Sequence, residues 1–393
     1  MAITTKEEGV WGLSEVYNKI NQGSIWEYTG QQLLFSWGRN TVNGTLGLND
    51  NVDRSSPTQV PGTTWSSVFV PGYAPSSQLA IKTDGTLWSW GYNYIGSLGL
   101  NQGGFPRISS PTQVPGTTWK QGAKQFHGAC AIKTDGTLWC WGNNTAGTLA
   151  QNNRTHRSSP TQVGSGSDWD KICGSYNSFT AIKTDGTMWE WGSTRSQNVD
   201  NNDAQRSSPC QIPGSTWSSF GSATGGVTCF RAIKTDGTLW TWGNNYYGIL
   251  ANNAVSNTGV SSPIQIPGSW TTIGGSGTIG YGIKTDGTSW VWGNNTHGTL
   301  GLNSRTQYSS PVQIPGTTWN SFYSAAEGSS HEVTIGTKTD GTMWSWGYHD
   351  YGQLGLNGPA NIMRSSPTQI PGTNWIDSEL SYSTKGWIST QSN

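Results

Sequence analysis

The sequence predicts an all-β fold, a seven-bladed β-propeller of four-stranded blades that is closed by pairing half-blades from the two ends of the chain. Three repeated features predict it. A Ser-Ser-Pro segment follows each of seven Trp-Gly dipeptides, and a further Trp follows each proline. Self-similarity at a fixed period of 20 to 50 or so residues is the signature of a repeat architecture. The Trp-Gly tryptophans are Trp37, Trp90, Trp141, Trp191, Trp242, Trp292 and Trp346.

Each repeat is expected to contain a β-hairpin. The segment Lys-Thr-Asp-Gly-Thr occurs six times, each copy between two short apolar runs. Asp-Gly in this setting indicates a two-residue hairpin loop with a type I′ turn. The Ala-Ile-Lys run before the turn and the Trp-x-Trp run after it are therefore predicted to be paired antiparallel strands. The turn aspartates are Asp84, Asp135, Asp185, Asp236, Asp286 and Asp340.

Two more strands complete each unit, one after the Pro-Gly-x-x-Trp segment and one around Pro-Thr-Gln-Val. Four strands make one propeller blade. The first unit, from residue 33, contains only the second half of a blade, and residues 375–390 match the missing first half. Pairing of these halves would close the ring and remove exposed sheet edges. The expected division is an N-terminal attachment segment, residues 1–30, and the propeller, residues 31–393.

The repeat at residues 85–99 reads Gly-Thr-Leu-Trp-Ser-Trp-Gly-x-Asn-x-x-Gly-x-Leu-Gly and resembles that of the regulator of chromosome condensation family. The resemblance covers residues 33–390 and implies a seven-bladed propeller. The family includes a nucleotide exchange factor for a small nuclear GTPase and a secreted β-lactamase inhibitor, so the resemblance implies fold and not activity. Its repeats often carry Gly-x-x-His before the second strand, whereas His127 lies one residue out of register.

Charge and composition restrict the partners. The formal net charge is zero, which argues against nucleic acid as a partner, and no apolar stretch is long enough for membrane insertion. The cysteines are five in number. Free thiols are expected, because the predicted hairpin brings Cys130 and Cys140 together only as diagonal neighbours.

Strand alternation sorts the connections onto two faces. The Asp-Gly turns and Pro-Gly links share a constant face, and the divergent loops share a variable face. Loops on a rigid scaffold often carry function, which predicts a binding surface here, although neutral drift explains the divergence equally well. Tyrosine beside asparagine suits recognition of glycan or protein, and packing beneath the loops is the alternative. The candidate binding residues are Tyr94, Arg107, Arg157, Arg195, Tyr246, Tyr247 and Tyr351.

On the constant face, the repeat predicts concentric rings of lysines and turn aspartates. One interpretation is an anion site, and the simpler one is turn chemistry.

The segment Gly-Val-Trp-Gly-Leu-Ser-Glu-Val-Tyr, residues 9–17, resembles short tags in structural proteins of tailed bacteriophages. The resemblance implies attachment to a virion, and the alternative is a segment that caps the constant face of the propeller itself. The candidate attachment residues are Trp11, Leu13, Val16, Tyr17, Ile20 and Trp26.

No catalytic motif is recognisable, so we expect no enzyme, no cofactor and no metal. The pairs His331-Glu332 and His349-Asp350 are interpreted as solvated loop residues. The leading prediction is a bacteriophage virion structural protein of the tail fibre, adhesin or decoration type. It would contact other virion proteins and a host surface glycan or protein. The alternative is a soluble propeller, cytoplasmic or released, that binds a partner protein and inhibits or regulates it.

Overall fold

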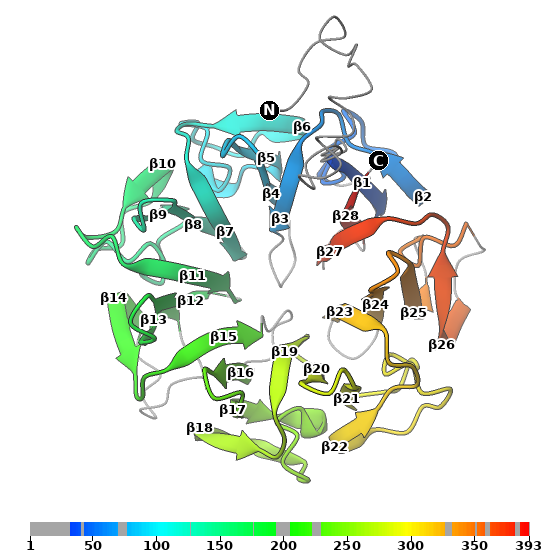
Figure 1. Ribbon diagram of the computed structural model, residues 1–393. Coiled ribbons are helices and arrows are strands. Elements are labelled where there is room, and N and C mark those ends of the chain that lie inside the picture. Colours follow the sequence, from blue (N-terminus) through cyan, green and yellow to red (C-terminus); the bar gives the residue numbers. More distant parts are fainter. Residues whose placement is uncertain are drawn as a thin grey trace, which may run out of the picture.

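The computed structural model describes residues 32–40, 43–69, 77–125, 127–175, 177–193, 205–221, 229–326, 332–349, 352–357, 362–381 and 386–392. Within these ranges it contains strands β1 to β28 and two short 3₁₀ helices, η1 (Tyr94–Gly96) and η2 (Tyr246–Gly248). The described strands form seven four-stranded sheets, which Figure 1 shows side by side around a common centre. The prediction of an all-β propeller of four-stranded blades is confirmed.

Six of the sheets are built from consecutive strands, and we number them as blades in chain order. Blade 1 contains β3 (Trp65–Phe69), β4 (Ser77–Lys82), β5 (Leu87–Tyr92) and β6 (Arg107–Val114). Blade 2 contains β7 (Trp119–Gln125), β8 (Gly128–Lys133), β9 (Leu138–Gly142) and β10 (Arg157–Gln162). Blade 3 contains β11 (Trp169–Gly174), β12 (Ser178–Lys183), β13 (Met188–Ser193) and β14 (Gln205–Ile212).

Blade 4 contains β15 (Trp217–Gly221), β16 (Cys229–Lys234), β17 (Leu239–Asn245) and β18 (Ser256–Ile266). Blade 5 contains β19 (Trp270–Gly275), β20 (Ile279–Lys284), β21 (Ser289–Gly293) and β22 (Tyr308–Gln313). Blade 6 contains β23 (Trp319–Ala326), β24 (Glu332–Lys338), β25 (Met343–His349) and β26 (Ile362–Ile370). In every blade the first strand lies nearest the common centre of the sheets (Figure 1).

The remaining sheet, which we call the shared sheet, combines strands from both halves of the chain. Its order is β2 (Arg54–Gln59), β1 (Gln32–Gly38), β28 (Gly386–Ser392) and β27 (Trp375–Ser381). β1 pairs with β28 in antiparallel register, Leu34 opposite Thr390. On its other side Trp37 of β1 packs in one apolar cluster with Val333 and Met343 of blade 6.

The Trp-Gly tryptophans form the contacts between neighbouring sheets. All seven are fully buried. Trp90 of blade 1, for example, donates its indole N–H to the carbonyl oxygen of Thr45 in the loop after β1, at 2.9 Å. A buried indole removes about 150 to 250 Å² from water, so these residues supply much of the core.

The hairpin turns differ from the predicted type I′ geometry. In blade 2, Gly136 has a φ of 79°, whereas Asp135 is not among the residues with positive φ. Lys133 N donates to Thr137 O at 3.0 Å, and Gly136 N donates to Lys133 O at 2.9 Å. The loop therefore has three residues, with glycine in the left-handed position that such loops require. The type I′ prediction is wrong because Asp-Gly occupies the second and third positions of this longer loop.

The longer loop shifts the hairpin register by one residue and changes the pairing of two cysteines. Cys130 lies directly opposite Cys140, with a Cα–Cα distance of 4.0 Å. Their sulfur atoms are bonded at 2.06 Å. The expectation of free thiols is wrong for this pair, while Cys173, Cys210 and Cys229 are free.

Candidate functional site

On the constant face, the repeated residues contact one another. Asp135 Oδ1 accepts hydrogen bonds from the backbone N–H and the hydroxyl of Thr137, at 2.9 and 2.7 Å. The hydroxyl of Thr137 in turn accepts the indole N–H of Trp139 at 2.9 Å. The hydrogen bond from the Thr137 side chain holds the pKa of Asp135 below its ordinary value.

The lysine of the same turn lies over two indole rings. Lys133 Nζ is 5.0 Å from the ring centroid of Trp119 and 4.5 Å from that of Trp139, within cation–π range. The arrangement occurs in six turns. Because each lysine contacts the indole rings of its own blade, the structure supports the interpretation as turn chemistry rather than as an anion site. The lysines held in this way are Lys82, Lys133, Lys183, Lys234, Lys284 and Lys338.

On the variable face, the asparagines that follow Trp-Gly build the loops. Asn93 Oδ1 accepts the backbone N–H of Leu98 at 3.0 Å, and Asn93 Nδ2 donates to Gln102 O at 2.9 Å. These asparagines are nearly or fully buried, so the prediction that they take part in recognition is wrong for them. The group consists of Asn40, Asn93, Asn144, Asn245 and Asn295.

A second loop residue fastens each described loop to the next sheet. Asn101 of blade 1 has a φ of 57° and donates its backbone N–H to Ser158 O of blade 2 at 2.8 Å. We call this contact the interblade latch. The part of the chain that the structure describes contains six latches, with donors Asn49, Asn101, Asn152, Asn253, Asn303 and Asn357.

Blade 1 carries an aromatic cluster that the other described loops lack. The ring centroid of Tyr94 lies 3.8 Å from that of His127, in a stacked arrangement, and 5.4 Å from that of Phe105. Phe105 also stacks on Tyr92 at 6.3 Å, and the Arg107 guanidinium lies 5.4 Å from the Tyr92 ring. We call these five residues the aromatic–arginine cluster. His127 comes from blade 2, so the cluster spans two blades.

The cluster is open to solvent. The side chain of Phe105 is 57% exposed, an unusual position for a large apolar ring. Tyr92, Tyr94 and His127 are half-buried, and Arg107 is exposed. A rigid aromatic surface with one arginine has the composition of protein-interface hot spots.

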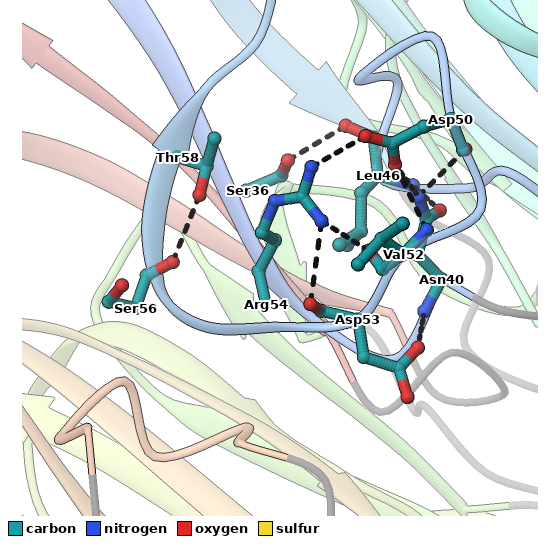
Figure 2. A network of polar contacts seen from close by, with 9 residues as sticks. All are labelled: Ser36, Asn40, Leu46, Asp50, Val52, Asp53, Arg54, Ser56 and Thr58. Atoms are coloured by element: carbon teal, nitrogen blue, oxygen red, sulfur yellow. Dashed lines mark hydrogen bonds and ion pairs between the residues drawn. The ribbon is translucent and has the colours of Figure 1, made fainter.

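Two arginines on the variable face differ in their bonding. Arg54 is used within its own loop: Nη2 lies 2.5 Å from Asp50 Oδ2 and Nη1 donates to Val52 O at 2.9 Å, as Figure 2 shows. Arg107 donates only Nε, to Asn43 Oδ1 at 3.2 Å. Within the described residues its two terminal nitrogens are therefore left for a ligand.

The other described candidates lie apart or have packing roles. Arg157 is the first residue of β10, and its backbone packs closely against Gly96 of η1. A Cβ added to Gly96 would lie only 3.2 Å from the Arg157 carbonyl oxygen. Tyr246 is 40% exposed in blade 4. Tyr247 packs against the apolar cluster of Cys229, Ile249 and Leu250, so the alternative of packing beneath the loops is correct for it.

Several candidates fall outside the described residues. They are Arg195, Tyr351 and the six attachment candidates Trp11, Leu13, Val16, Tyr17, Ile20 and Trp26. The sequence-based selection missed Phe105 and His127. A phenylalanine within the otherwise polar loop Gln-Gly-Gly-Phe-Pro was the signal that could have identified Phe105.

Among the described residues, four charged side chains are fully or almost fully buried: Lys124, Glu190, Arg231 and Glu332. Lys124 Nζ donates to Ser77 Oγ at 2.8 Å, and burial lowers the pKa of Lys124 to about 7. Arg231 donates to backbone carbonyl oxygens, among them that of Ile279 at 3.1 Å. Burial raises the pKa of Glu332 to about 7, and Asn294 Nδ2 donates to its Oε1 at 3.0 Å. The interpretation of Glu332 as a solvated residue is wrong.

A cavity of about 270 Å³ lies among the innermost strands. Phe69, Phe220 and Phe322 contribute rings to its lining. Among the described residues, no group of three or more histidine, cysteine, aspartate or glutamate side chains is placed to hold a metal ion. The described part of the chain also has no helix with the length and apolar character needed to cross a membrane.

Comparison with known proteins identifies relatives of the repeat. The chain is 24% identical over 357 residues to the E3 ubiquitin-protein ligase HERC2 of Homo sapiens, covering 85% of this chain and 7% of HERC2. It is 24% identical to the ultraviolet-B receptor UVR8 of Arabidopsis thaliana, covering 59% of this chain and 53% of UVR8. The chain therefore spans only part of these relatives.

Solved structures share the fold. Prp20p of Saccharomyces cerevisiae superimposes with a TM-score of 0.79 at 19% identity, covering 93% of this chain and 92% of Prp20p. Human WBSCR16 superimposes with a TM-score of 0.76 at 17% identity, and the match covers 92% of this chain and 99% of the WBSCR16 chain. The sequence model of the RCC1-like domain family matches residues 29–385 of this chain. Because this match covers most of the sequence, the chain belongs to the RCC1-like domain family.

Proposed function

We propose that this chain is a protein-binding propeller whose variable face contacts a partner protein and regulates it. The aromatic–arginine cluster is the observation that carries the proposal. It places a 57% exposed phenylalanine and an arginine with unused donors on loops fixed to a rigid scaffold. Aromatic residues and arginine are enriched where proteins bind one another.

Relatives of the same architecture support a binding role. The structure of Prp20p was described with its binding properties to Gsp1p and histones, and another structure holds Prp20 bound to Kap60. Those partners belong to Prp20p. The ligase activity in the name of HERC2 belongs to a protein of which this chain spans 7%. That this chain is not an enzyme stays a prediction.

Photo-crosslinking tests the proposal. A photoreactive phenylalanine analogue would replace Phe105 on the variable face or, as the control, the exposed Thr117 on the constant face. Each protein would be irradiated in an extract of the cells that produce it, and adducts identified by mass spectrometry. We expect a defined adduct from position 105 that excess unlabelled protein competes away. Absence of that adduct, or the same adduct from position 117, would contradict the proposal.

The proposal also requires a rigid ring, and we propose that the shared sheet closes the propeller as its seventh blade. Removing residues 386–393 would remove β28 and expose the edges of β1 and β27. We expect the melting temperature to fall by at least about 10 °C, because one sheet loses its continuity. Removing residues 1–30 is the control. An unchanged melting temperature after the C-terminal deletion would argue for an open ring.

The virion location stays a prediction that rests on residues 9–17 alone. Immunogold labelling of purified particles with antibody against the propeller tests it. Label on tail fibres would make the partner a host surface molecule, and label on the head would make it a capsid subunit. Unlabelled particles would leave the soluble regulatory propeller.

A further inference from the structure

We infer that the aromatic–arginine cluster binds an acidic segment of the partner protein in which a carboxylate neighbours an aromatic side chain. This inference rests on the proposed function and specifies the chemistry of its partner. It depends on three properties of blades 1 and 2: their charge, their unused hydrogen-bond donors and the rigidity of the loop.

The charge of this part of the variable face is one-sided. Residues 92–108 and 143–157, which form the variable loops of blades 1 and 2, include Arg107, Arg154 and Arg157 and no aspartate or glutamate. The loop of the shared sheet differs, because it balances Arg39 and Arg54 with two aspartates. An acidic segment would therefore meet attraction at blades 1 and 2, because their own variable loops carry no competing carboxylate.

The Arg107 guanidinium group has donors available for such a segment. Ion pairs among the described residues involve Arg54, Lys120 and Lys183, and Arg107 takes part in none of these three. Arg107 is held by Asn43 at its Nε and lies over the Tyr92 ring, so its terminal nitrogens form a fork with a fixed plane. Such a fork matches the two oxygens of a carboxylate.

The loop that presents the aromatic rings is fastened along its length. Asn93 N donates to Pro106 O at 2.8 Å, and Ile95 N donates to Gly104 O at 3.2 Å. Ile95 has a φ of 50°, a conformation that branched residues rarely adopt without support from their surroundings. The latch from Asn101 ties the loop to blade 2. Because little flexibility is lost on binding, the exposed Phe105 and half-buried Tyr94 are prepared to receive an aromatic side chain.

A nucleic acid also offers negative charge and flat rings, but the molecule does not suit it. The formal net charge of the chain is zero. Nucleic-acid binding draws on a broad basic surface with on the order of six to ten phosphate contacts, whereas these two loops hold three arginines. An acidic protein segment needs only one or two guanidinium groups beside an apolar anchor.

Fluorescence anisotropy with defined probes tests the inference. The whole 393-residue chain would be titrated into a labelled copolymer of glutamate and tyrosine, and then into polyglutamate and oligothymidylate. The variants are Arg107→Gln and Phe105→Ala. The matched controls are Arg305→Gln, an exposed arginine in the blade 5 loop, and Tyr246→Ala, an exposed ring in blade 4.

We expect the copolymer to bind more tightly than either other probe. Arg107→Gln and Phe105→Ala should each weaken binding at least about tenfold, and the two controls less than about twofold. Equal losses in variants and controls, no binding of the copolymer, or tighter binding of oligothymidylate would each overturn the inference. A crosslinked partner that binds the Arg107→Gln and Phe105→Ala proteins with full affinity would also overturn it while leaving the proposed function intact.

Discussion

The constant and variable faces use repetition in opposite ways. On the constant face, Asp135 contacts Thr137 and Lys133 covers Trp139, and five other turns repeat the arrangement. On the variable face, Phe105 and Arg107 occur in one blade and extend toward solvent. The comparison teaches that the residues repeated from turn to turn are used within the scaffold, whereas Phe105 and Arg107, which belong to a single loop, are available to a partner. Four pairs of substitutions sharpen the comparison, from the largest expected effect to the smallest.

Trp90→Ala should cause the largest loss. The indole is fully buried between blade 1 and the shared sheet and donates to Thr45 O. Removal of a buried tryptophan side chain costs about 3 to 5 kcal/mol, which urea unfolding measures as a lower midpoint. Phe105→Ala is the control, because the exposed ring should contribute no more than about 0.5 kcal/mol. Equal losses would show that Phe105 is part of the scaffold.

Gly96→Ala and Gly104→Ala separate backbone strain from crowding within one variable loop. Both glycines have positive φ, 78° and 80°. A Cβ on Gly96 would lie 2.5 Å from Ser158 Cα, whereas a Cβ on Gly104 has no neighbour closer than 3.9 Å. We expect about 1 kcal/mol of strain in both variants and about 1 to 3 kcal/mol more for Gly96→Ala, measured by urea unfolding. Similar values would mean that blade 2 moves aside.

Glu332→Gln tests how the buried carboxyl group of Glu332 makes the free energy of unfolding depend on pH, for comparison with the turn aspartates of the constant face. The pKa of Glu332 is raised to about 7, from about 4.3 in an unfolded chain, so the folded protein binds the extra proton and loses stability as pH rises between these values. In the wild-type protein the loss should reach at most about 4 kcal/mol above pH 7, and unfolding of the variant measured across that range should show no such loss.

The turn aspartates should show the opposite sign. Their pKa values are lowered, so their contribution is present above about pH 4, the unfolded value, and is lost as pH falls through the folded one. Asp135→Asn therefore serves as the control: it should remove the pH dependence of unfolding that lies below about pH 4 and leave that between pH 4 and pH 7 unchanged. A wild-type protein whose stability is flat between pH 4 and pH 7 would contradict the assignment to Glu332.

Lys133→Met should have the smallest effect. It removes the ammonium from two indole rings while keeping an apolar chain over them. A partly exposed cation–π contact contributes about 0.5 to 1 kcal/mol, which a precise thermal unfolding series resolves. Lys120→Met, which removes an exposed pair with Asp170, should cost less. A larger effect of Lys120→Met would reverse the ranking of these contacts.

Much of the fold could be predicted from the sequence because local signals repeat. The seven Trp-Gly dipeptides of the repeat and six Asp-Gly turns indicate strands and hairpins independently in each unit. The turn type could not be predicted, because Asp-Gly fits both the two-residue loop and the three-residue loop that was found. That one-residue difference decides whether Cys130 lies beside or opposite Cys140.

The site could be predicted only in part. Tyr94 and Arg107 were identified because they follow strands whose positions the repeat fixes. His127 was not, because its stacking on Tyr94 joins two blades and depends on how one sheet lies against the next. The packing role of Tyr247 was likewise undecidable from sequence, since it depends on burial beneath its own loop.

The interblade latch leaves the variable loops open to sequence change during evolution. Both of its bonded atoms, the Asn101 nitrogen and the Ser158 oxygen, belong to the main chain. The side chains between the latch and the following strand take no part in it, so most of them can be exchanged without breaking this contact between blades. Such loops could be randomised as a library for selecting new binders, with the left-handed asparagine and its serine acceptor kept constant.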